Sequence, residues 1–303
     1  MTGHYSSKRL IKGAFVFAIA LTQLLPPDAA GQSRQLPKAG FQRFSGNLPG
    51  SASPGAGIGS ISGTGLTSPG VHLTSGMERT ARNAREPYNP GEPKLNMALV
   101  RWPRNKMPLK IWISPGLQLP QLPFEQLPDT RVETVFQMMQ NENPFAELTA
   151  APGWTEQNNY QVAAGIEQWR QFETEGLLRF GFTTNPQEAQ IMVFFNDNFQ
   201  GAAGPGGTNV GALTCAQLFT PEQVLLPQFR QKPVIMEFST RVNHLPEKMQ
   251  SSATHEFGHA LGIKAHSPYR DDIMNENNVV FSLSEGDKAT IRLLYKTEPK
   301  FVM

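Results

Sequence analysis

The chain has 303 residues, a formal net charge of +2 and only 17% charged residues. This balance does not indicate nucleic-acid binding, and the chain shows no Lys/Arg cluster of the kind that phosphate binding requires. Apolar residues make up 39%, which is enough for a packed core, and the length allows one good-sized domain with appendages or two small domains. The single cysteine, Cys215, excludes an intrachain disulfide, so the fold must depend on its core, on a metal or on both.

The first 31 residues have the pattern of a secretory signal peptide. Three basic residues, the last of them Lys12, precede the apolar stretch from Gly13 to Leu25, and small residues follow up to Gly31. The alternative is an uncleaved membrane anchor, but the apolar stretch has 13 residues, whereas a spanning helix needs roughly 20. We therefore predict a secreted or otherwise extracytoplasmic protein that has no membrane association after the signal is removed.

Residues 32–96 differ in composition from the rest of the chain. Between Ser45 and Met77 there is no Lys, Arg, Asp or Glu, and Gly, Ser, Pro and Thr dominate. Such a segment buries too little apolar surface to offset the entropy lost on ordering. We predict a flexible linker over residues 32–96, with a propeptide that blocks a functional site as the alternative. The folded domain is predicted over residues 97–303, with order beginning near Ala98.

Within that domain, alternating apolar residues or short apolar runs indicate strands, and apolar residues at helical spacing indicate helices. Strands are predicted at residues 107–114, 189–197, 208–214 (as an edge strand) and 233–240. Helices are predicted within residues 160–180, from about Pro246, and from Ser284, whose side chain suits a reciprocal cap with Asp287. The first helix carries one apolar stripe, made by Val162, Ile166, Trp169 and Phe172.

Three of the six histidines, His255, His259 and His266, lie within twelve positions. On a helix, His255 and His259 would lie within about 40° of each other and one turn apart, so both imidazoles could reach one metal ion. Glu256 would lie about 100° from His255, beside the metal but off the ligand line, where it could touch a metal-bound water. The opposite face of this helix is apolar and suits the core, with Met249, Ala253, Phe257, Ala260 and Leu261.

Gly262 interrupts this helical pattern. Glycine readily adopts the left-handed conformation that ends a helix, so the chain can turn there and bring His266 back as a third ligand. Three neutral imidazoles leave the fourth position of tetrahedral zinc open for water, which is the arrangement of a catalytic site. The alternative, a set of unrelated histidines, explains neither the glycine nor Glu256.

The pattern His-Glu-x-x-His-x-x-Gly-x-x-His from His255 to His266, followed by Met274, resembles the signature of the metzincin metalloproteases. Ser267 and the segment after Met274 are more similar to the matrixin branch than to the astacin or serralysin branches. The resemblance is strong over residues 246–295, weaker back to about residue 107, and absent from the first hundred residues. It implies an α+β zinc-protease domain with a twisted, mostly parallel sheet, an antiparallel edge strand, an active-site helix and a small C-terminal subdomain. Met274 would form an apolar floor beneath the zinc.

By the same resemblance, the chain would be a secreted zinc-dependent endopeptidase that hydrolyses peptide bonds through a zinc-activated water. His255, His259 and His266 would bind one catalytic Zn²⁺, and Glu256 would act as general base. The substrate would be a protein or peptide in extended conformation, paired with the edge strand at 208–214 unless that edge simply faces water. Residues 275–283 would line the pocket for the side chain that follows the cut bond. We expect a monomer with no nucleic-acid partner.

The sequence also departs from the matrixin pattern. No histidine lies between His72 and His244, so we do not expect the second, structural zinc of that branch, and no ligand pattern for structural Ca²⁺ is evident. No tyrosine follows Met274 closely, so we predict three protein ligands. Cys215 is either a buried thiol or a thiol that blocks the zinc. The alternative function is a non-catalytic zinc-binding interaction module with the same fold, and a third is a zinc hydrolase acting on a non-peptide bond.

Overall fold

The computed structural model describes residues 85–201, 210–277 and 279–303, and its main sheet has the strand order β3-β2-β4-β6-β5. These strands are β2 (Leu109–Gln118), β3 (Phe180–Phe182), β4 (Ile191–Asn196), β5 (Ala212–Cys215) and β6 (Val234–Ser239). Neighbouring strands are parallel except for β5, which runs antiparallel to β6 at the edge. The prediction of an α+β fold with a mostly parallel sheet and an antiparallel edge strand is confirmed.

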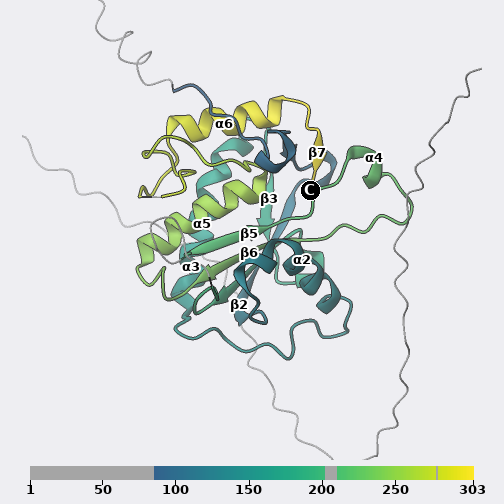
Figure 1. Ribbon diagram of the computed structural model, residues 1–303, viewed down its shortest axis with the longest axis vertical. Coiled ribbons are helices and arrows are strands. Elements are labelled where there is room, and N and C mark those ends of the chain that lie inside the picture. The colour runs from purple at the N-terminus through teal and green to yellow at the C-terminus, as the bar shows by residue number, and fades with distance from the viewer. Residues whose placement is uncertain (1–84, 202–209, 278) are drawn as a thin grey trace, which may run out of the picture. The chain divides into compact units, whose positions relative to one another are not determined.

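The helices and the remaining short elements surround this sheet (Figure 1). The α-helices are α2 (Leu127–Met138), α3 (Glu156–Glu167), α4 (Pro221–Val224), α5 (Pro246–Leu261) and α6 (Glu285–Lys296). The 3-10 segments are η1 (Pro93–Leu95), η2 (Arg104–Lys106), η3 (Phe124–Gln126), η4 (Gln168–Glu173) and η5 (Pro186–Glu188). A separate two-stranded parallel sheet joins β1 (Val100–Arg101) to β7 (Phe301–Val302).

The core has two parts because helices cover both faces of the sheet. Successive side chains of a strand point to opposite faces, and those of β4 divide accordingly. Val193 and Phe195 belong to the cluster that contains the buried faces of α3 and α5, whereas Met192 and Phe194 belong to the cluster that contains α2. Figure 1 shows α5 and α2 on opposite sides of the sheet. Burial on both faces explains why β4 is a continuous apolar run in the sequence rather than an alternating one.

Most predicted elements lie where the sequence placed them, and several short elements and one helix were missed. The stripe of the first helix is fully buried, but α3 covers only its first two residues, and the chain continues as η4 through Trp169 and Phe172. The sequence analysis predicted no helix at α2 or α4 and no strand at β1, β3 or β7. Of the predicted edge strand at 208–214, residues 208 and 209 lie outside the described residues, and β5 begins at Ala212.

The chain is packed before Ala98, where we expected order to begin. Tyr88 is 7% exposed, its hydroxyl donates to Asp287 at 3.0 Å, and its backbone N–H donates to the hydroxyl of Thr290 at 3.1 Å. Arg85 forms ion pairs with Asp271 and Asp272. Specific polar contacts hold this segment, and composition does not reveal them. The predicted signal peptide and the predicted linker as far as residue 84 lie outside the described residues.

Among the helices of the described part, none combines the length and the apolar character that crossing a bilayer would require.

Candidate metal centre

Helix α5 presents a packing face to the core and a polar face to the metal centre. The five apolar residues predicted for its packing face, from Met249 to Leu261, are completely buried. Helix α3 approaches very closely, because a Cβ added at Gly165 would lie 2.5 Å from the carbonyl oxygen of Gln250. The indole N–H of Trp169 also donates to the carbonyl of Thr254 at 3.0 Å. Close packing on one side therefore fixes the rotation of α5 about its axis and so the direction of its histidines.

Gly262 ends α5 in the left-handed conformation that the sequence predicted, with φ +115°. The N–H groups of Gly262 and Ile263 donate to the carbonyls of His259 and Gly258, both at 3.0 Å, which satisfies carbonyls that the helix end leaves free. A Cβ at this position would lie 2.2 Å from the carbonyl oxygen of Val100. Both the backbone conformation and the approach of β1 therefore require glycine, and the turn that follows returns the chain toward α5.

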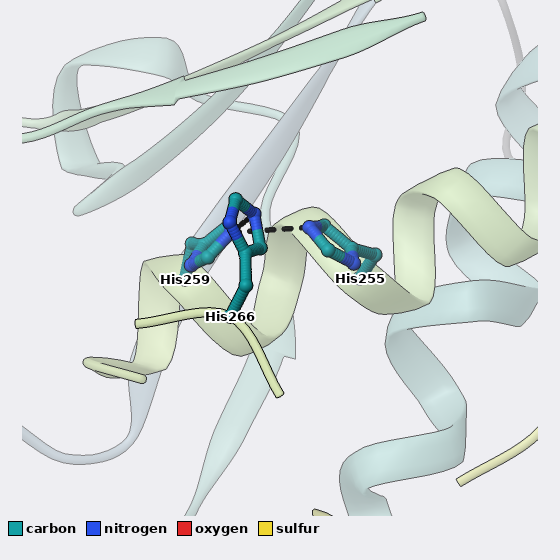
Figure 2. A group of neighbouring side chains, drawn as sticks. All are labelled: His255, His259 and His266. Atoms are coloured by element: carbon teal, nitrogen blue, oxygen red, sulfur yellow. Dashed lines mark hydrogen bonds between the residues drawn. The ribbon is translucent and has the colours of Figure 1, made fainter. Parts of the chain in front are cut away.

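The three histidines predicted as ligands converge. Figure 2 shows the rings of His255 and His259 on α5 and the ring of His266 from the following loop pointing toward one another. The Nε2 atom of His259 lies 3.1 Å from Nε2 of His255 and 3.3 Å from Nε2 of His266. All three ligand atoms lie within 4.8 Å of one another. The sequence prediction that Gly262 turns the chain so that His266 joins the pair agrees with this geometry.

Hydrogen bonds on the far side of two rings determine which nitrogen carries the proton. Nδ1 of His255 lies 2.7 Å from the carbonyl of Ile273, and Nδ1 of His259 lies 2.5 Å from the carbonyl of Ile263. A carbonyl only accepts, so each Nδ1 carries the hydrogen and each Nε2 of these two rings has a free lone pair. Carbonyl partners of this kind orient metal-binding histidines and fix their tautomer.

This donor set fits a zinc ion. Two lone pairs that face each other at 3.1 Å repel unless a cation or a proton lies between them. Tetrahedral zinc with nitrogen ligands at 2.0–2.1 Å separates those nitrogens by roughly 3.3 Å, close to the two distances found here. Burial lowers the pKa of His255 to about 4 and holds the pKa of His259 well below its usual value. The ring of His266 is partly shielded from water, which lowers its pKa too, although the residue as a whole is exposed. The rings are therefore neutral near pH 7 and able to bind a metal.

Glu256 follows His255 on α5, and its side chain is held by the edge strand. The residue is 6% exposed, and its Oε2 accepts a hydrogen bond of 2.6 Å from the hydroxyl of Thr214 on β5. Burial raises the pKa of Glu256 to about 7, although the hydrogen bond from Thr214 and the positive charge of Lys264 act in the opposite direction. A carboxyl group with a pKa near 7 can both accept and release a proton at neutral pH.

Met274 packs directly against α5, the helix that carries His255 and His259. It is completely buried, and a Cβ added at Gly258 would lie 2.4 Å from its sulfur. The backbone that leads into Met274 is held by Asp287, which accepts the N–H of Ile273 at 2.8 Å and that of Met274 at 3.3 Å. The Met-containing turn expected from the resemblance is therefore in contact with α5.

The sequence analysis did not identify the roles of two residues of this region. Thr214 was treated only as part of an edge strand, and Asp287 only as a helix cap. The capping box of Ser284 and Asp287 is present, but Asp287 also holds the turn at residues 273–274. Neither role leaves a local signal, because the partners lie 42 and 14 residues away in the sequence.

Cys215 lies on the other face of the sheet from the histidines. Alternation along β5 places Ala212 in the core part that contains α5, and Leu213 and Cys215 in the part that contains α2. The thiol is directed toward the carbonyl of Leu127, with Sγ at 3.7 Å, and burial raises its pKa to about 12. Of the two interpretations of Cys215, this geometry supports the buried thiol.

The matrixin family model matches residues 153–296. This span begins just before α3, ends with α6, and includes the three histidines, Glu256 and Met274. No curated protein matches the chain. The sheet, the converging histidines and the family match together support a metzincin-like zinc metallopeptidase domain, closest to the matrixin branch, over residues 153–296.

Proposed function

We propose that the chain is a secreted zinc-dependent endopeptidase. In this proposal His255, His259 and His266 hold one catalytic zinc ion, and Glu256 is the general base. The observation that carries the proposal is the convergence of three imidazole Nε2 atoms within a segment that matches the matrixin model. Secretion rests on the predicted signal peptide at residues 1–31.

The metal requirement follows from the donor set. When bound, zinc would act as a Lewis acid and lower the pKa of a water molecule from about 15.7 toward about 7. The three histidines supply neutral nitrogen donors, and two of them are oriented by the carbonyls of Ile273 and Ile263. Three protein ligands leave one position for water or for substrate.

Glu256 would move the proton. Its carboxylate takes the proton of the attacking water as the water oxygen bonds to the peptide carbonyl carbon. The same carboxyl group then gives the proton to the leaving amine nitrogen as the C–N bond breaks. The Thr214 hydroxyl binds Oε2, so Oε1 is the oxygen that remains for the water. The pKa of about 7 suits both transfers.

The substrate would bind as an extended strand along β5. This strand pairs with β6 on one side, and in the described part of the chain no strand pairs with its other side. An edge with free backbone N–H and C=O groups can accept a peptide by strand addition. Methylation of the backbone nitrogens of a peptide substrate removes the N–H groups that this pairing needs, so it should raise KM. If the edge only faces water, methylation leaves KM unchanged.

The pocket for the side chain after the cut bond would lie between α5 and the segment after Met274. A cavity of about 280 Å³ is lined there by Leu245, Glu247, Lys248, Ser251, Ser252, Val279 and Phe281. Val279 and Phe281 fall within residues 275–283, which the resemblance to matrixins assigned to this pocket. Its largely apolar lining favours an apolar substrate side chain at that position.

A mixed fluorogenic peptide library tests the proposal. Purified wild type should cleave peptides, lose activity with a chelator and regain it with Zn²⁺. Glu256→Gln should bind the same amount of zinc and show activity at least about 100-fold lower, because a placed general base contributes about 10²- to 10⁴-fold.

Each other outcome supports a different function. A wild type that binds zinc and cleaves no peptide supports the non-catalytic interaction module. Zinc-dependent hydrolysis of an ester or a glycoside without peptide cleavage supports a hydrolase that acts on a non-peptide bond.

A further inference from the structure

The hydroxyl of Thr214 is in a position to select the orientation of the Glu256 side chain. Its Oγ1 lies 2.6 Å from Oε2 of Glu256 and 3.1 Å from the backbone carbonyl oxygen of the same residue. A hydroxyl has one hydrogen, and hydrogen bonds to a charged acceptor are shorter and stronger than those to a neutral one. The hydrogen therefore goes to the carboxylate. Within the described residues, no other side chain donates a hydrogen bond to this carboxylate.

The position of Thr214 on its strand explains how the hydroxyl reaches α5. Leu213 and Cys215 point toward α2, so Thr214 between them points to the α5 side of the sheet. Strand β5 is fixed by its ladder with β6, in which Thr214 is opposite Met236. The donor is therefore attached to a rigid element, whereas Glu256 has three side-chain torsions that its own helix does not determine.

We propose that Thr214 is a positioning residue for Glu256 and couples the general base to the substrate-binding edge of the sheet. This inference rests on the proposed function. Thr214 occupies Oε2 and so leaves Oε1 for the water. The backbone of the same strand would also pair with the substrate. Strand β5 would therefore position both the scissile peptide bond and the Glu256 carboxylate. Without the hydroxyl the carboxylate would sample other rotamers, and a smaller fraction of molecules would be ready to react.

The test uses the full-length, zinc-loaded protein and two variants. Thr214→Val keeps the shape of the side chain and removes the donor, whereas Thr214→Ser keeps the donor. We expect Thr214→Val to lower kcat about tenfold with KM changed less than about twofold, and Thr214→Ser to retain kcat within about threefold. Zinc content should equal that of wild type in both variants. An unchanged kcat in Thr214→Val, or an equal loss in Thr214→Ser, would overturn the inference.

Thr240→Val is the control for loss of a threonine hydroxyl that donates a hydrogen bond of the same length. Thr240 is 5% exposed, and its hydroxyl donates to the carbonyl of Pro152, also at 2.6 Å, at the end of β6. This variant should be destabilised by an amount similar to that in Thr214→Val and should keep the wild-type kcat. A loss of kcat in Thr240→Val equal to that in Thr214→Val would show that general destabilisation causes the effect, and would also overturn the inference.

A binding measurement separates failure of this inference from failure of the proposed function. A peptide hydroxamate chelates a divalent metal and has a hydroxyl whose proton a correctly placed carboxylate can take, so its affinity reports the orientation of Glu256 without turnover. By calorimetry, Thr214→Val should bind the hydroxamate about tenfold more weakly than wild type, and Thr214→Ser should bind it as wild type does. If wild type cleaves no peptide, the proposed function fails, and this comparison still decides the role of Thr214: equal affinities refute it.

Discussion

Asp287 accepts the backbone N–H of Ile273 at 2.8 Å and that of Met274 at 3.3 Å, and the second N–H shares a peptide unit with the carbonyl that orients His255, a proposed zinc ligand. The carbonyl of Ile273 lies 2.7 Å from Nδ1 of His255. The hydroxyl of Tyr88 donates to the same carboxylate at 3.0 Å. A buried carboxylate on α6 therefore links the segment before β1 to the orientation of a ligand on α5, as partners beyond the direct ligands do in other metal sites.

Tyr88→Phe should weaken the metal centre as well as the fold. The substitution leaves Asp287 with one donor fewer, so we expect the free energy of unfolding to fall by about 1–2 kcal/mol. Zinc should also pass to a chelator faster than it does from wild type, because Asp287 is then freer to release the turn at residues 273–274. Urea unfolding and stopped-flow transfer of zinc to a coloured chelator measure the two effects.

Tyr295→Phe is the control for Tyr88→Phe. Tyr295 is also buried, and its hydroxyl donates to the carbonyl of Leu261 at 2.9 Å without contacting Asp287. The control should lose a similar amount of stability and release zinc at the wild-type rate. If both variants release zinc equally fast, Asp287 does not transmit the effect.

Gly262→Ala should be among the most damaging single substitutions in the domain. The new Cβ would meet the carbonyl oxygen of Val100 at 2.2 Å on a residue with φ +115°, so both steric overlap and backbone strain oppose it. We expect a loss of about 3 kcal/mol or more in the free energy of unfolding. Gly176→Ala separates the two causes, because Gly176 has φ +67° and nothing within 4 Å of its added Cβ. It should cost only about 1 kcal/mol, and equal losses in the two variants would contradict the close approach of β1.

The convergence of the three histidines could be predicted from the sequence because the parts that produce it are local. His255, Glu256, His259 and Gly262 share one helix and its end, and a period of 3.6 residues with one left-handed turn places His266 without knowledge of the tertiary structure. The contact between Thr214 and Glu256 could not be predicted in this way. It depends on the register of β5 against β6 and on how α5 packs on the sheet, and neither can be read from a window of sequence.

The missed elements also depend on tertiary contacts rather than on a local sequence pattern. The strand β3 is only Phe180–Phe182, too short to show a period, and it exists because its backbone pairs with Leu109 and its neighbours. Helix α2 follows a Pro-rich connection, and its core contacts come from few residues, chiefly Val132 and Val135. Tyr88 is similar: one buried aromatic residue in a polar, Pro-rich segment gives no periodic signal.

His266→Ala should separate metal binding from folding. His266 is exposed and follows the helix end, whereas His255 is 7% exposed and donates to the Ile273 carbonyl. We expect metal-free His266→Ala to unfold at the same temperature as metal-free wild type, and to bind zinc at least about 100-fold more weakly, because one of three ligands is lost. His255→Ala should lose both zinc affinity and metal-free stability. Thermal unfolding with chelator and competitive zinc titration test this, and wild-type zinc affinity in His266→Ala would remove His266 from the ligand set.

Glu256→Gln should stabilise the metal-free protein at alkaline pH and not at acid pH. Burial raises the pKa of Glu256 from 4.5 to about 7, so between these values the folded protein binds more protons at this site than the unfolded chain does. The contribution of Glu256 to stability is thus fully present below about pH 4.5 and is lost as the pH rises through about 7. A shift of this size corresponds to about 3 kcal/mol. Glutamine keeps an oxygen that can accept from Thr214 and carries no charge, so it avoids this loss.

The three histidines contribute with the opposite sign, because burial lowers the pKa of His255 to about 4 and the protonated form is favoured in the unfolded chain. Both proteins retain His255, so this contribution cancels when Glu256→Gln and wild type are compared at one pH. Urea unfolding in the presence of a chelator should give equal stabilities at pH 4.5 and a variant more stable by up to about 3 kcal/mol at pH 8.5. A difference that stays constant from pH 4.5 to 8.5 would mean that Glu256 ionises as an exposed glutamate does, and the structural reason for its proposed role as a base at neutral pH would be lost.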